Sequence, residues 1–187
     1  MINMPKTSRK KLSVAEAWLE AGLNILASSG PAFLSIENLT RETGKTKGSF
    51  YHHFRNRDRY VFDLLKFYEK KSTIGVITAS MEGEDAPTRL GRLTDLAFQL
   101  PGRLELAFRA WALYHPAVKK YQEKIDQIRL LFLQNLYNSL IDDQDEAWML
   151  AYKNYSCFLG LQQIRNQLSA DNFNVSIKNI FQMPAKR

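Results

Sequence analysis

The sequence predicts an all-α fold with about nine helices. Apolar residues recur every three or four positions through most of the chain, which is the period of an amphipathic helix. No segment alternates apolar and polar residues for long enough to make a convincing strand. The 187 residues include only nine glycines and six prolines, and several of these stand where a helical pattern stops. With 45% hydrophobic residues, the chain has ample material for a core.

The first expected helix has clear start and stop signals. Ser13 and Glu16 fit a capping box, because the hydroxyl and the carboxylate each accept a hydrogen bond from the other residue's backbone N–H. A Gly-Pro pair at 30–31 ends the helix. Further helices are expected at 35–43, 46–54, 58–81, 90–100, 104–111, from 118 over about six turns, at 144–169 and at 174–182.

The charge of the chain is unevenly distributed. Residues 1–60 hold ten Lys and Arg against five Asp and Glu, whereas residues 61–187 hold sixteen against fourteen. Most of the net charge of +7 therefore lies in the first third. Such a basic segment is suited to binding a polyanion, although the excess of positive charge could also belong to an ordinary solvated surface. We expect an N-terminal domain at 1–57, which includes a basic arm, and a second domain at 58–187.

The two short helices at 35–43 and 46–54 have the length and tight connection of a helix-turn-helix. Gly44 can end the first helix in the left-handed conformation. Leu39 and Phe50 are spaced to pack the two helices against each other. In this motif the second helix lies in the major groove of DNA, while the preceding helix crosses the phosphate backbone.

The start of the second short helix suits contact with bases. Lys47, Gly48 and Ser49 lie there, where glycine permits close approach and lysine or serine can donate hydrogen bonds to base edges. Taken singly, Lys47 could be a solvated charge, and Tyr51 and Phe54 could be core aromatics. Their joint spacing is much more specific than any one of them, and it favours DNA binding.

The whole segment resembles the DNA-binding signature of the TetR (tetracycline-repressor-like) family of transcription regulators. The matching residues are Ser35, Leu39, Thr43, Gly44, Lys45, Thr46, Gly48, Phe50, Tyr51, His53, Phe54, Asn56 and Arg57. The resemblance covers about residues 12–62; the remainder is similar only in length, helix count and all-helical character. It implies a helix-turn-helix unit followed by a helical effector-binding and dimerisation bundle. The implied function is that of a homodimeric repressor that binds a pseudo-palindromic operator in double-stranded DNA and is released by a small molecule.

The resemblance also assigns roles to residues of the recognition helix. It implies that Lys47 and Ser49 face bases. Tyr51 and His53 would reach phosphates or a thymine methyl group. Thr46 would cap this helix and touch a phosphate.

Three further contacts follow from the same resemblance. Ser35 would cap the preceding helix and touch a phosphate, and Arg57 would hold a phosphate from the start of the fourth helix. Lys45 departs from the pattern, because that position is usually apolar. We expect the lysine stem to cover apolar surface while the ammonium lies in water or on phosphate.

An effector pocket is expected among the later helices. Its candidate residues are Phe67, Phe98, Phe108, Trp111 and Tyr114, whose aromatic character indicates an apolar or planar ligand. Aromatic residues at helical spacing also serve as plain core, and that alternative stays open. No charged partner for the ligand can be assigned.

The expected helix at 144–169 has two apolar stripes, where a monomeric surface helix needs only one. One stripe consists of Trp148, Tyr152, Tyr155 and Leu159, and the other of Leu150, Cys157, Leu161, Ile164 and Leu168. We therefore predict that a second copy of the chain covers the first stripe in a homodimer. Complete burial in the core of one subunit is the alternative.

Several other classes of protein and site are excluded or disfavoured. One cysteine cannot form an internal disulfide, and nothing resembles a secretion signal, so a cytoplasmic protein is expected. The sequence contains no run of about 18 apolar residues, the length that is needed to cross a membrane. His52 and His53 are neighbours on a helix, which does not suit a shared metal ion, and no cofactor is expected.

No enzymatic activity is expected either. The sequence Gly44-Lys45-Thr46 mimics the end of a phosphate-binding loop, but Leu39 occupies the position of the required first glycine. No GxSxG or other nucleophile setting occurs. A second hypothesis remains, namely a non-enzymatic helical ligand-binding or adaptor protein that uses its basic surface on RNA or on an anionic membrane. Such a protein would bind the RNA or the membrane weakly and without selectivity for the shape of its partner.

Overall fold

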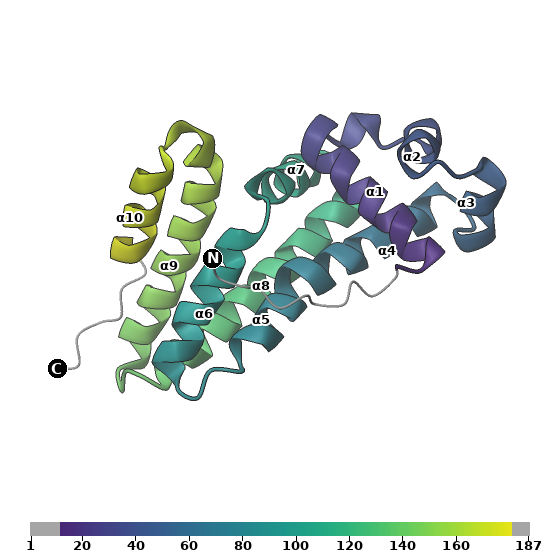
Figure 1. The fold of residues 1–187 in the computed structure, drawn as a ribbon. Helices are drawn as coiled ribbons and strands as arrows, with labels where there is room; N and C mark the ends of the chain where they lie inside the picture. Colours follow the sequence, from purple (N-terminus) through teal and green to yellow (C-terminus); the bar gives the residue numbers. More distant parts are fainter. Residues whose placement is uncertain (1–11, 181–187) are drawn as a thin grey trace, which may run out of the picture.

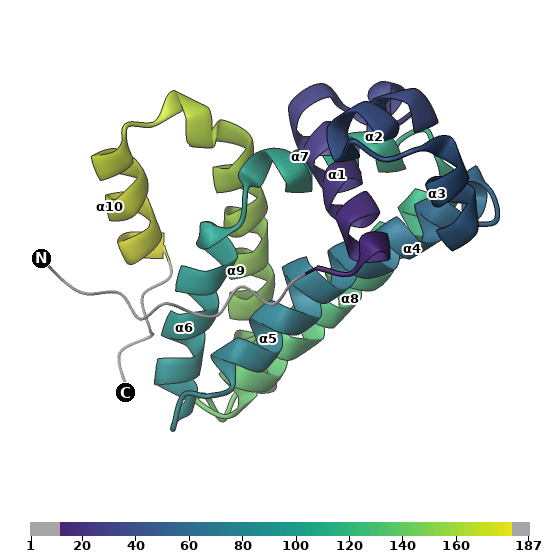
Figure 2. The same ribbon diagram turned by 45° about the vertical axis from the view of Figure 1, so that its right-hand side comes forward.

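The computed structural model describes residues 12–180, and within them the chain forms ten α-helices and no β-strand (Figures 1 and 2). The helices are α1 (Val14–Ser29), α2 (Ile36–Thr43), α3 (Lys47–His53), α4 (Arg57–Glu69), α5 (Gly75–Ser80), α6 (Ala86–Gln99), α7 (Gly102–Ala112), α8 (Pro116–Asn138), α9 (Gln144–Ile164) and α10 (Ala170–Ile180). A π-helical turn, Lys70–Ile74, joins α4 to α5 without a break. Counted as one rod, α4 and α5 bring the total to nine, so the predicted all-α fold is confirmed.

The helices are arranged with α1, α2 and α3 at one end of the molecule and α10 at the other (Figures 1 and 2). The rod formed by α4, the π-turn and α5 lies beside α8, and α9 packs along α8. Helix α7 contacts α1, α8 and α9. The α4–α5 rod is therefore the covalent link between the first three helices and the rest of the bundle, and α7 forms a second physical contact between them.

The largest core cluster lies at the end that contains the first three helices. It is built around fully buried Trp18 of α1, Phe50 of α3 and Tyr60 of α4, and it continues to Phe108 of α7 and Val118 of α8. The predicted domain division at residues 57 and 58 falls at the first turn of α4. The apolar packing thus runs from the first three helices into α7 and α8 without a gap.

The predicted signals at the ends of α1 are confirmed. The Glu16 backbone N–H donates to Ser13 Oγ at 3.2 Å, and the Ser13 N–H donates to Glu16 Oε2 at 2.9 Å. Gly30 has a φ of 82°, a conformation that other residues rarely adopt, and its N–H closes the end of the helix on Ile25 and Leu26. The basic arm with Lys6, Arg9, Lys10 and Lys11 lies outside the described residues.

The C-terminal region differs from the sequence prediction. The helix expected at 144–169 ends at Ile164, and a 3₁₀ turn at Arg165–Gln167 follows it. The last helix begins at Ala170, before the expected start at 174, and its expected end at 182 lies outside the described residues. The reason is tertiary, because Phe173 turns back to pack on Phe98 and Leu161 in a small separate core. No helix among residues 12–180 is long and apolar enough to cross a membrane.

The π-turn is a feature that the helical periodicity did not predict. The Gly75 N–H donates to the carbonyl of Lys70, five residues earlier, instead of the residue four earlier. A methyl group added at Gly75 would lie 2.9 Å from that same carbonyl oxygen. Glycine at this position therefore permits the wider turn, which a side chain would oppose.

We expect Gly75→Ala to lower the free energy of unfolding by about 1–3 kcal/mol, because the added methyl group collides with backbone. Gly91→Ala in α6 is the matched control, since nothing lies within 4 Å of its added methyl group. The control should be neutral or stabilising by up to about 1 kcal/mol, as alanine favours helix. Urea denaturation at one fixed protein concentration measures both. Equal stabilisation by the two substitutions would contradict the role given to Gly75.

Candidate functional site

The turn between α2 and α3 is fixed by its own hydrogen bonds. Gly44 has a left-handed φ of 64° and ends α2, as predicted. Thr43 Oγ1 donates to the Leu39 carbonyl at 2.8 Å and accepts a bond from the Lys45 N–H at 3.3 Å. These bonds use the threonine side chain to satisfy backbone groups that the end of the helix leaves free. The angle between the two short helices is therefore well defined.

Hydroxyl side chains cap both helices of the motif. Ser35 Oγ accepts the Asn38 N–H at 3.2 Å, and Thr46 Oγ1 accepts the Ser49 N–H at 3.2 Å. Each satisfies one of the N–H groups that the first turn of a helix leaves unpaired. The capping roles predicted for Ser35 and Thr46 are confirmed.

The inner face of α3 is anchored by Phe50, which is completely buried. Its ring contacts Trp18 edge-on at 5.4 Å and lies 5.2 Å from the rings of both Phe54 and Tyr60. The Tyr60 hydroxyl in turn donates to the Trp18 carbonyl at 2.8 Å. A helix of seven residues is unstable alone, so this aromatic cluster holds α3 in place and determines which face it presents to solvent.

The outer face of α3 and its flanks carry the residues that the resemblance assigns to DNA. Exposed residues are Thr46, Lys47, Tyr51, His53 and Arg57, and half-buried residues are Ser35, Lys45 and Ser49. All eight are thus at least partly exposed and lie in or next to α2, α3 and the start of α4, elements that Figure 1 shows at one end of the molecule. Tyr51 is a large aromatic residue that remains 53% exposed, although its ring edge meets Phe50.

Lys47 forms an ion pair with Glu37 of α2, with Nζ 2.7 Å from Oε1. The hydrogen bond raises the pKa of Lys47 and lowers the pKa of Glu37, and the attraction between the charges adds to both shifts. Both side chains are well exposed, so water screens the pair and it contributes little to stability. The pair still directs the lysine, because it holds the ammonium against α2 when no other anion is near.

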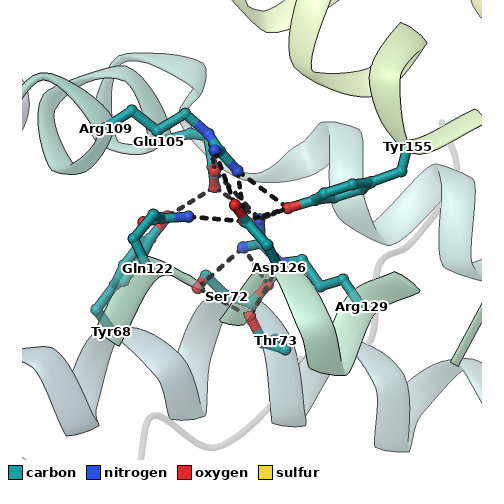
Figure 3. A network of polar contacts seen from close by, with 9 residues as sticks. All are labelled: Tyr68, Ser72, Thr73, Glu105, Arg109, Gln122, Asp126, Arg129 and Tyr155. Carbon is teal, nitrogen blue, oxygen red and sulfur yellow. Dashed lines mark hydrogen bonds and ion pairs between the residues drawn. The ribbon is translucent and has the colours of Figure 1, made fainter. Parts of the chain in front are cut away.

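A second polar feature lies inside the helical bundle, where charged side chains from α7 and α8 meet (Figure 3). Glu105 of α7 is only 6% exposed. It lies 2.8 Å from Arg109 Nε and 3.0 Å from Arg129 Nη1, and it accepts a hydrogen bond from the Tyr68 hydroxyl at 2.6 Å. Burial alone would raise the pKa of Glu105, but the charges of Arg129 and Arg109 hold it below its ordinary value.

The same cluster contains a second carboxylate, Asp126 of α8. Arg109 Nη2 donates to it at 2.7 Å, the Tyr155 hydroxyl donates at 2.6 Å and Gln122 Nε2 donates at 3.0 Å. Burial would raise the pKa of Asp126, yet the hydrogen bonds from Arg109 and Tyr155 keep it below its ordinary value. Two carboxylates and two guanidinium groups thus balance one another, with Glu105 and Arg129 in the interior and Asp126 and Arg109 partly exposed.

Arg129 also connects this cluster to the π-turn. Its Nε donates to Thr73 Oγ1 at 3.0 Å, and its Nη2 donates to the Ser72 carbonyl at 3.2 Å (Figure 3). The Ser72 carbonyl lies in a segment whose regular helical hydrogen bonding is interrupted. The arginine therefore supplies a partner at the point where the α4–α5 rod changes its geometry.

A cavity adjoins the cluster. Its lining residues are Ser72, Thr73, Val76, Ile77, Leu90, Leu93, Thr94, Ala97, Phe98, Leu100, Arg129, Phe132, Leu133, Asn154, Tyr155 and Phe158. Its volume is about 60 Å³, which holds only a few water molecules when each needs roughly 10–15 Å³. The walls come from the π-turn, α5, α6, α8 and α9.

The five aromatic residues predicted to form an effector pocket lie in different places. Phe98 lines the cavity. Phe108 stacks on Tyr68 in the main core and Trp111 is buried there too, while Phe67 is half-buried against the same core. Tyr114 is 88% exposed. The structure does not bring the five residues together around one cavity.

Helix α9 presents an apolar face to solvent. Trp148 and Tyr152 are 54% and 53% exposed, and their rings stack 5.3 Å apart. Leu159 is half-buried, whereas Tyr155 is buried with its hydroxyl on Asp126. The exposed part of the predicted stripe therefore consists of Trp148 and Tyr152, and Tyr155 faces the interior.

Sequence analysis did not identify the charged cluster, although a signal for it exists. Arg129 lies on the face of α8 that also carries Ile125 and Leu133, and Glu105 lies on the face of α7 that carries Phe108. A charge within a buried stripe indicates a buried ion pair. Between residues 12 and 180, no three His, Cys, Asp or Glu side chains are placed so that they could hold a metal ion.

No protein-family model matches the chain. A segment of 65 residues is 32% identical to YwcC, an HTH-type transcriptional regulator of Bacillus subtilis. The match covers 35% of this chain and 29% of YwcC, so the chain aligns with less than a third of that relative's length.

Solved structures resemble the chain over most of its length. Escherichia coli NemR in its reduced form has a TM-score of 0.74 at 17% identity and covers 92% of this chain and 100% of its own. A transcriptional regulator from Saccharomonospora viridis in complex with choline has a TM-score of 0.74 at 16% identity, with coverages of 89% and 92%. A TetR-family transcriptional regulator from Streptomyces coelicolor has a TM-score of 0.73 at 16% identity, with coverages of 90% and 89%. The chain therefore has the fold of the TetR-family transcriptional regulators, as the resemblance in sequence predicted.

The buried cluster makes the stability of the protein depend on acid pH. The pKa values of Glu105 and Asp126 in the folded protein lie below their ordinary values. Their ionised forms therefore contribute fully to the free energy of unfolding above about pH 5.5, and this contribution is lost as the pH falls through the folded-state pKa values. We expect Glu105→Gln to lower the free energy of unfolding at pH 7 by about 3–5 kcal/mol, since it leaves a buried charge on Arg129 uncompensated. It should also flatten the decline of stability towards pH 3.5.

Glu82→Gln provides the control for this experiment, because its ion pair with Arg92 is well exposed. The control should change the free energy of unfolding by less than about 1 kcal/mol. Denaturant titrations at a series of pH values compare the three proteins. If the free energy of unfolding of Glu105→Gln declined towards acid pH as steeply as that of the unmodified protein, this carboxylate would not be a cause of the pH dependence.

Proposed function

We propose that this protein is a cytoplasmic, homodimeric transcription regulator that binds a pseudo-palindromic operator in double-stranded DNA, most simply as a repressor, and is released by a small molecule. The observation that carries the proposal is the orientation of α3. Phe50 fixes its inner face in an aromatic cluster, and the face turned to solvent offers Lys47, Tyr51 and His53. This arrangement supports insertion of α3 in the major groove.

In this proposal the residues divide between bases and phosphates. Lys47 and Ser49, at the start of α3, face base edges. Tyr51 and His53 contact phosphates or a thymine methyl group, and Lys45 contacts phosphate with its ammonium. On DNA, Lys47 exchanges its carboxylate partner Glu37 for a base or phosphate acceptor, which is feasible because the ion pair is solvent-exposed.

Phosphate contacts at the edges of the motif hold its register on the duplex. Thr46 and Ser35 contribute from the first turns of α3 and α2, where free N–H groups and the helix dipole attract anions. Arg57, exposed at the start of α4, contributes a charge from the next element. These contacts raise affinity for any DNA sequence, whereas those of Lys47 and Ser49 discriminate between sequences.

A homodimer gives this site its specificity. A twofold pair places two recognition helices about 34–36 Å apart, or a multiple of that distance, to match the helical repeat of DNA. We assign the interface to the exposed face of α9, where Trp148 and Tyr152 stack in solvent and Gly160 leaves open space for a neighbouring helix. Leu159 lies at the border of this face.

Release by an effector requires a physical connection between its site and α3. The α4–α5 rod supplies that connection, because α4 contacts α1 and its continuation lines the cavity. An effector that prefers a different placement of the rod lowers the affinity for the operator by the same factor by which the operator lowers affinity for the effector. Of the predicted pocket residues, we retain Phe98 as a contact. The choline complex of a protein with the same fold supports a ligand-binding role for this architecture.

Selection of bound fragments from random double-stranded DNA tests the proposal. The expected product is a pseudo-palindrome bound by a dimer. Recovery of no shared sequence, with equally weak binding to RNA or to anionic vesicles, would contradict it and would favour the adaptor hypothesis.

On the selected operator, we expect Lys47→Ala to lower affinity roughly fivefold to a hundredfold while its binding to scrambled DNA changes little. The reason is the loss of a contact to a base edge. Arg57→Ala is the matched comparison, because a phosphate contact should weaken binding to both DNAs and reduce the log–log salt slope by roughly one unit. Mobility-shift titrations at several salt concentrations measure the affinity of each of the two variants for each of the two DNAs. Equal losses on both DNAs for Lys47→Ala would make it a phosphate contact.

We expect Tyr152→Glu to convert the dimer into a monomer, because it places a charge in the centre of the apolar face of α9. Operator affinity should fall about a hundredfold or more, since the two half-sites would then be bound independently. Leu113→Glu is the control, as Leu113 is exposed just after the end of α7 and lies far along the chain from this face. Sedimentation velocity and mobility shifts report the two effects. A dimer that survives Tyr152→Glu with full affinity would place the interface elsewhere.

A further inference from the structure

The cavity between the α4–α5 rod and helices α6, α8 and α9 has an unequal lining. Most of its wall is apolar and includes Val76, Leu90, Ala97, Phe98 and Leu133. Of its polar lining residues, Ser72, Thr73, Arg129 and Tyr155 belong to the charged cluster (Figure 3), and Thr94 and Asn154 are the others. A molecule in this cavity would therefore meet hydrocarbon and aromatic rings on most of its surface.

The charges beside the cavity are already satisfied by one another. A guanidinium has five N–H donors, and those of Arg129 are directed at six acceptor atoms on Glu105, Tyr155, Ser72 and Thr73. An anionic ligand could bind Arg129 only by displacing one of these acceptors.

A cationic ligand would meet the corresponding obstacle. Glu105 and Asp126 are the carboxylates of the cluster, and both accept hydrogen bonds from arginine side chains. Tyr155, which lines the cavity, donates its hydroxyl proton to Asp126 and accepts from Arg109 at 3.0 Å. A charged ligand in this cavity would lose its hydration without gaining a free counter-charge, which is unfavourable.

The size of the cavity determines how a ligand can enter. At about 60 Å³ the cavity is smaller than the volume of about 150 Å³ of an apolar cavity that was engineered in another protein and binds benzene. A ligand with even one aromatic ring therefore fits wholly inside only if part of the wall moves. Helices α8 and α9 are long and pack along each other, whereas α5 is six residues long and follows the irregular π-turn. Displacing the π-turn and α5 breaks the hydrogen bonds from Arg129 to Thr73 and Ser72, whereas displacing α8 or α9 separates two long helices that pack along each other.

We propose that the cavity takes an uncharged, mainly apolar small molecule, and that its binding widens the cavity by displacing the π-turn and α5. The regulatory consequence rests on the proposed function, because displacement of the α4–α5 rod alters operator binding only if the protein binds an operator. Ligand binding selects the widened state, and the operator selects the state with the narrow cavity.

Three probes of the same shape and different charge test the ligand class on the full-length protein at pH 7. Toluene is uncharged, benzoate is an anion and benzylamine is a cation at this pH. Toluene should give a saturable rise in Tm, and its affinity should exceed that of either charged probe by about tenfold or more, because only the charged probes require an unpaired buried charge. Tighter binding of benzoate or benzylamine would overturn the proposal.

A cavity-filling substitution shows where the probe binds. Ala97→Met places a side chain in the cavity and should abolish the toluene-induced shift in Tm. Ala110→Met, on the exposed side of α7, is the matched control and should retain it. If Ala97→Met does not fold, nuclear Overhauser effects from toluene to the methyl groups of Val76 and Leu90 in the unmodified protein provide the same information. Toluene contacts at other residues would overturn the assignment.

Operator binding is measured first without a probe and then with saturating toluene. Toluene should lower operator affinity by about fivefold or more, within the range of ordinary allosteric coupling. Absence of operator binding without a probe would contradict the proposed function and leave the ligand class intact. Unchanged operator affinity at saturating toluene would overturn the coupling through the π-turn while the DNA-binding role stands.

Discussion

The buried ion pair between Glu105 and Arg129 is the constraint on which the arrangement of the bundle depends. Removing two charges from water is costly, and their attraction offsets that cost only when the geometry is good and the remaining polar atoms are hydrogen-bonded. Here the pair meets those conditions by recruiting Tyr68 from α4, Arg109 from α7, and Ser72 and Thr73 from the π-turn. The pair therefore favours the arrangement in which all of these atoms are hydrogen-bonded.

This constraint reaches α3 through α4. Tyr68, near one end of that helix, bonds to Glu105, and Tyr60, near the other end, bonds to the Trp18 carbonyl and packs against Phe50. Any change that moves α4 relative to α7 and α8 must therefore also move it relative to the first three helices or strain these contacts. The two polar bonds are buried, where unmade hydrogen bonds are costly. The rod is thus held at both ends, which makes it suitable for transmitting a displacement.

The surface of the molecule separates three kinds of chemistry. Cationic and aromatic side chains gather around α3, apolar rings are exposed on α9, and hydrocarbon lines the internal cavity. The partners proposed for them are, in the same order, the polyanionic duplex, a second copy of the chain and a small uncharged molecule. Arg129 and Tyr155 of the charged cluster line part of the cavity, but the charges of the cluster compensate one another. Their neutrality lets the cavity lie beside four ionised groups and still favour an apolar occupant.

The sequence by itself determined the helical class, the start and end of α1 and α2, the caps Ser35 and Thr46, and the inner and outer faces of α3. These features depend on local hydrogen bonds and on the helical period, both of which are encoded within a few residues. Only the tertiary structure decided the π-turn, the cluster around Glu105 and Arg129, the cavity and the inward orientation of Tyr155. These depend on contacts between residues far apart in the chain, such as Thr73 with Arg129 and Tyr68 with Glu105. Periodicity cannot reveal which charges will meet, because it shows the face a residue occupies and not the element packed against that face.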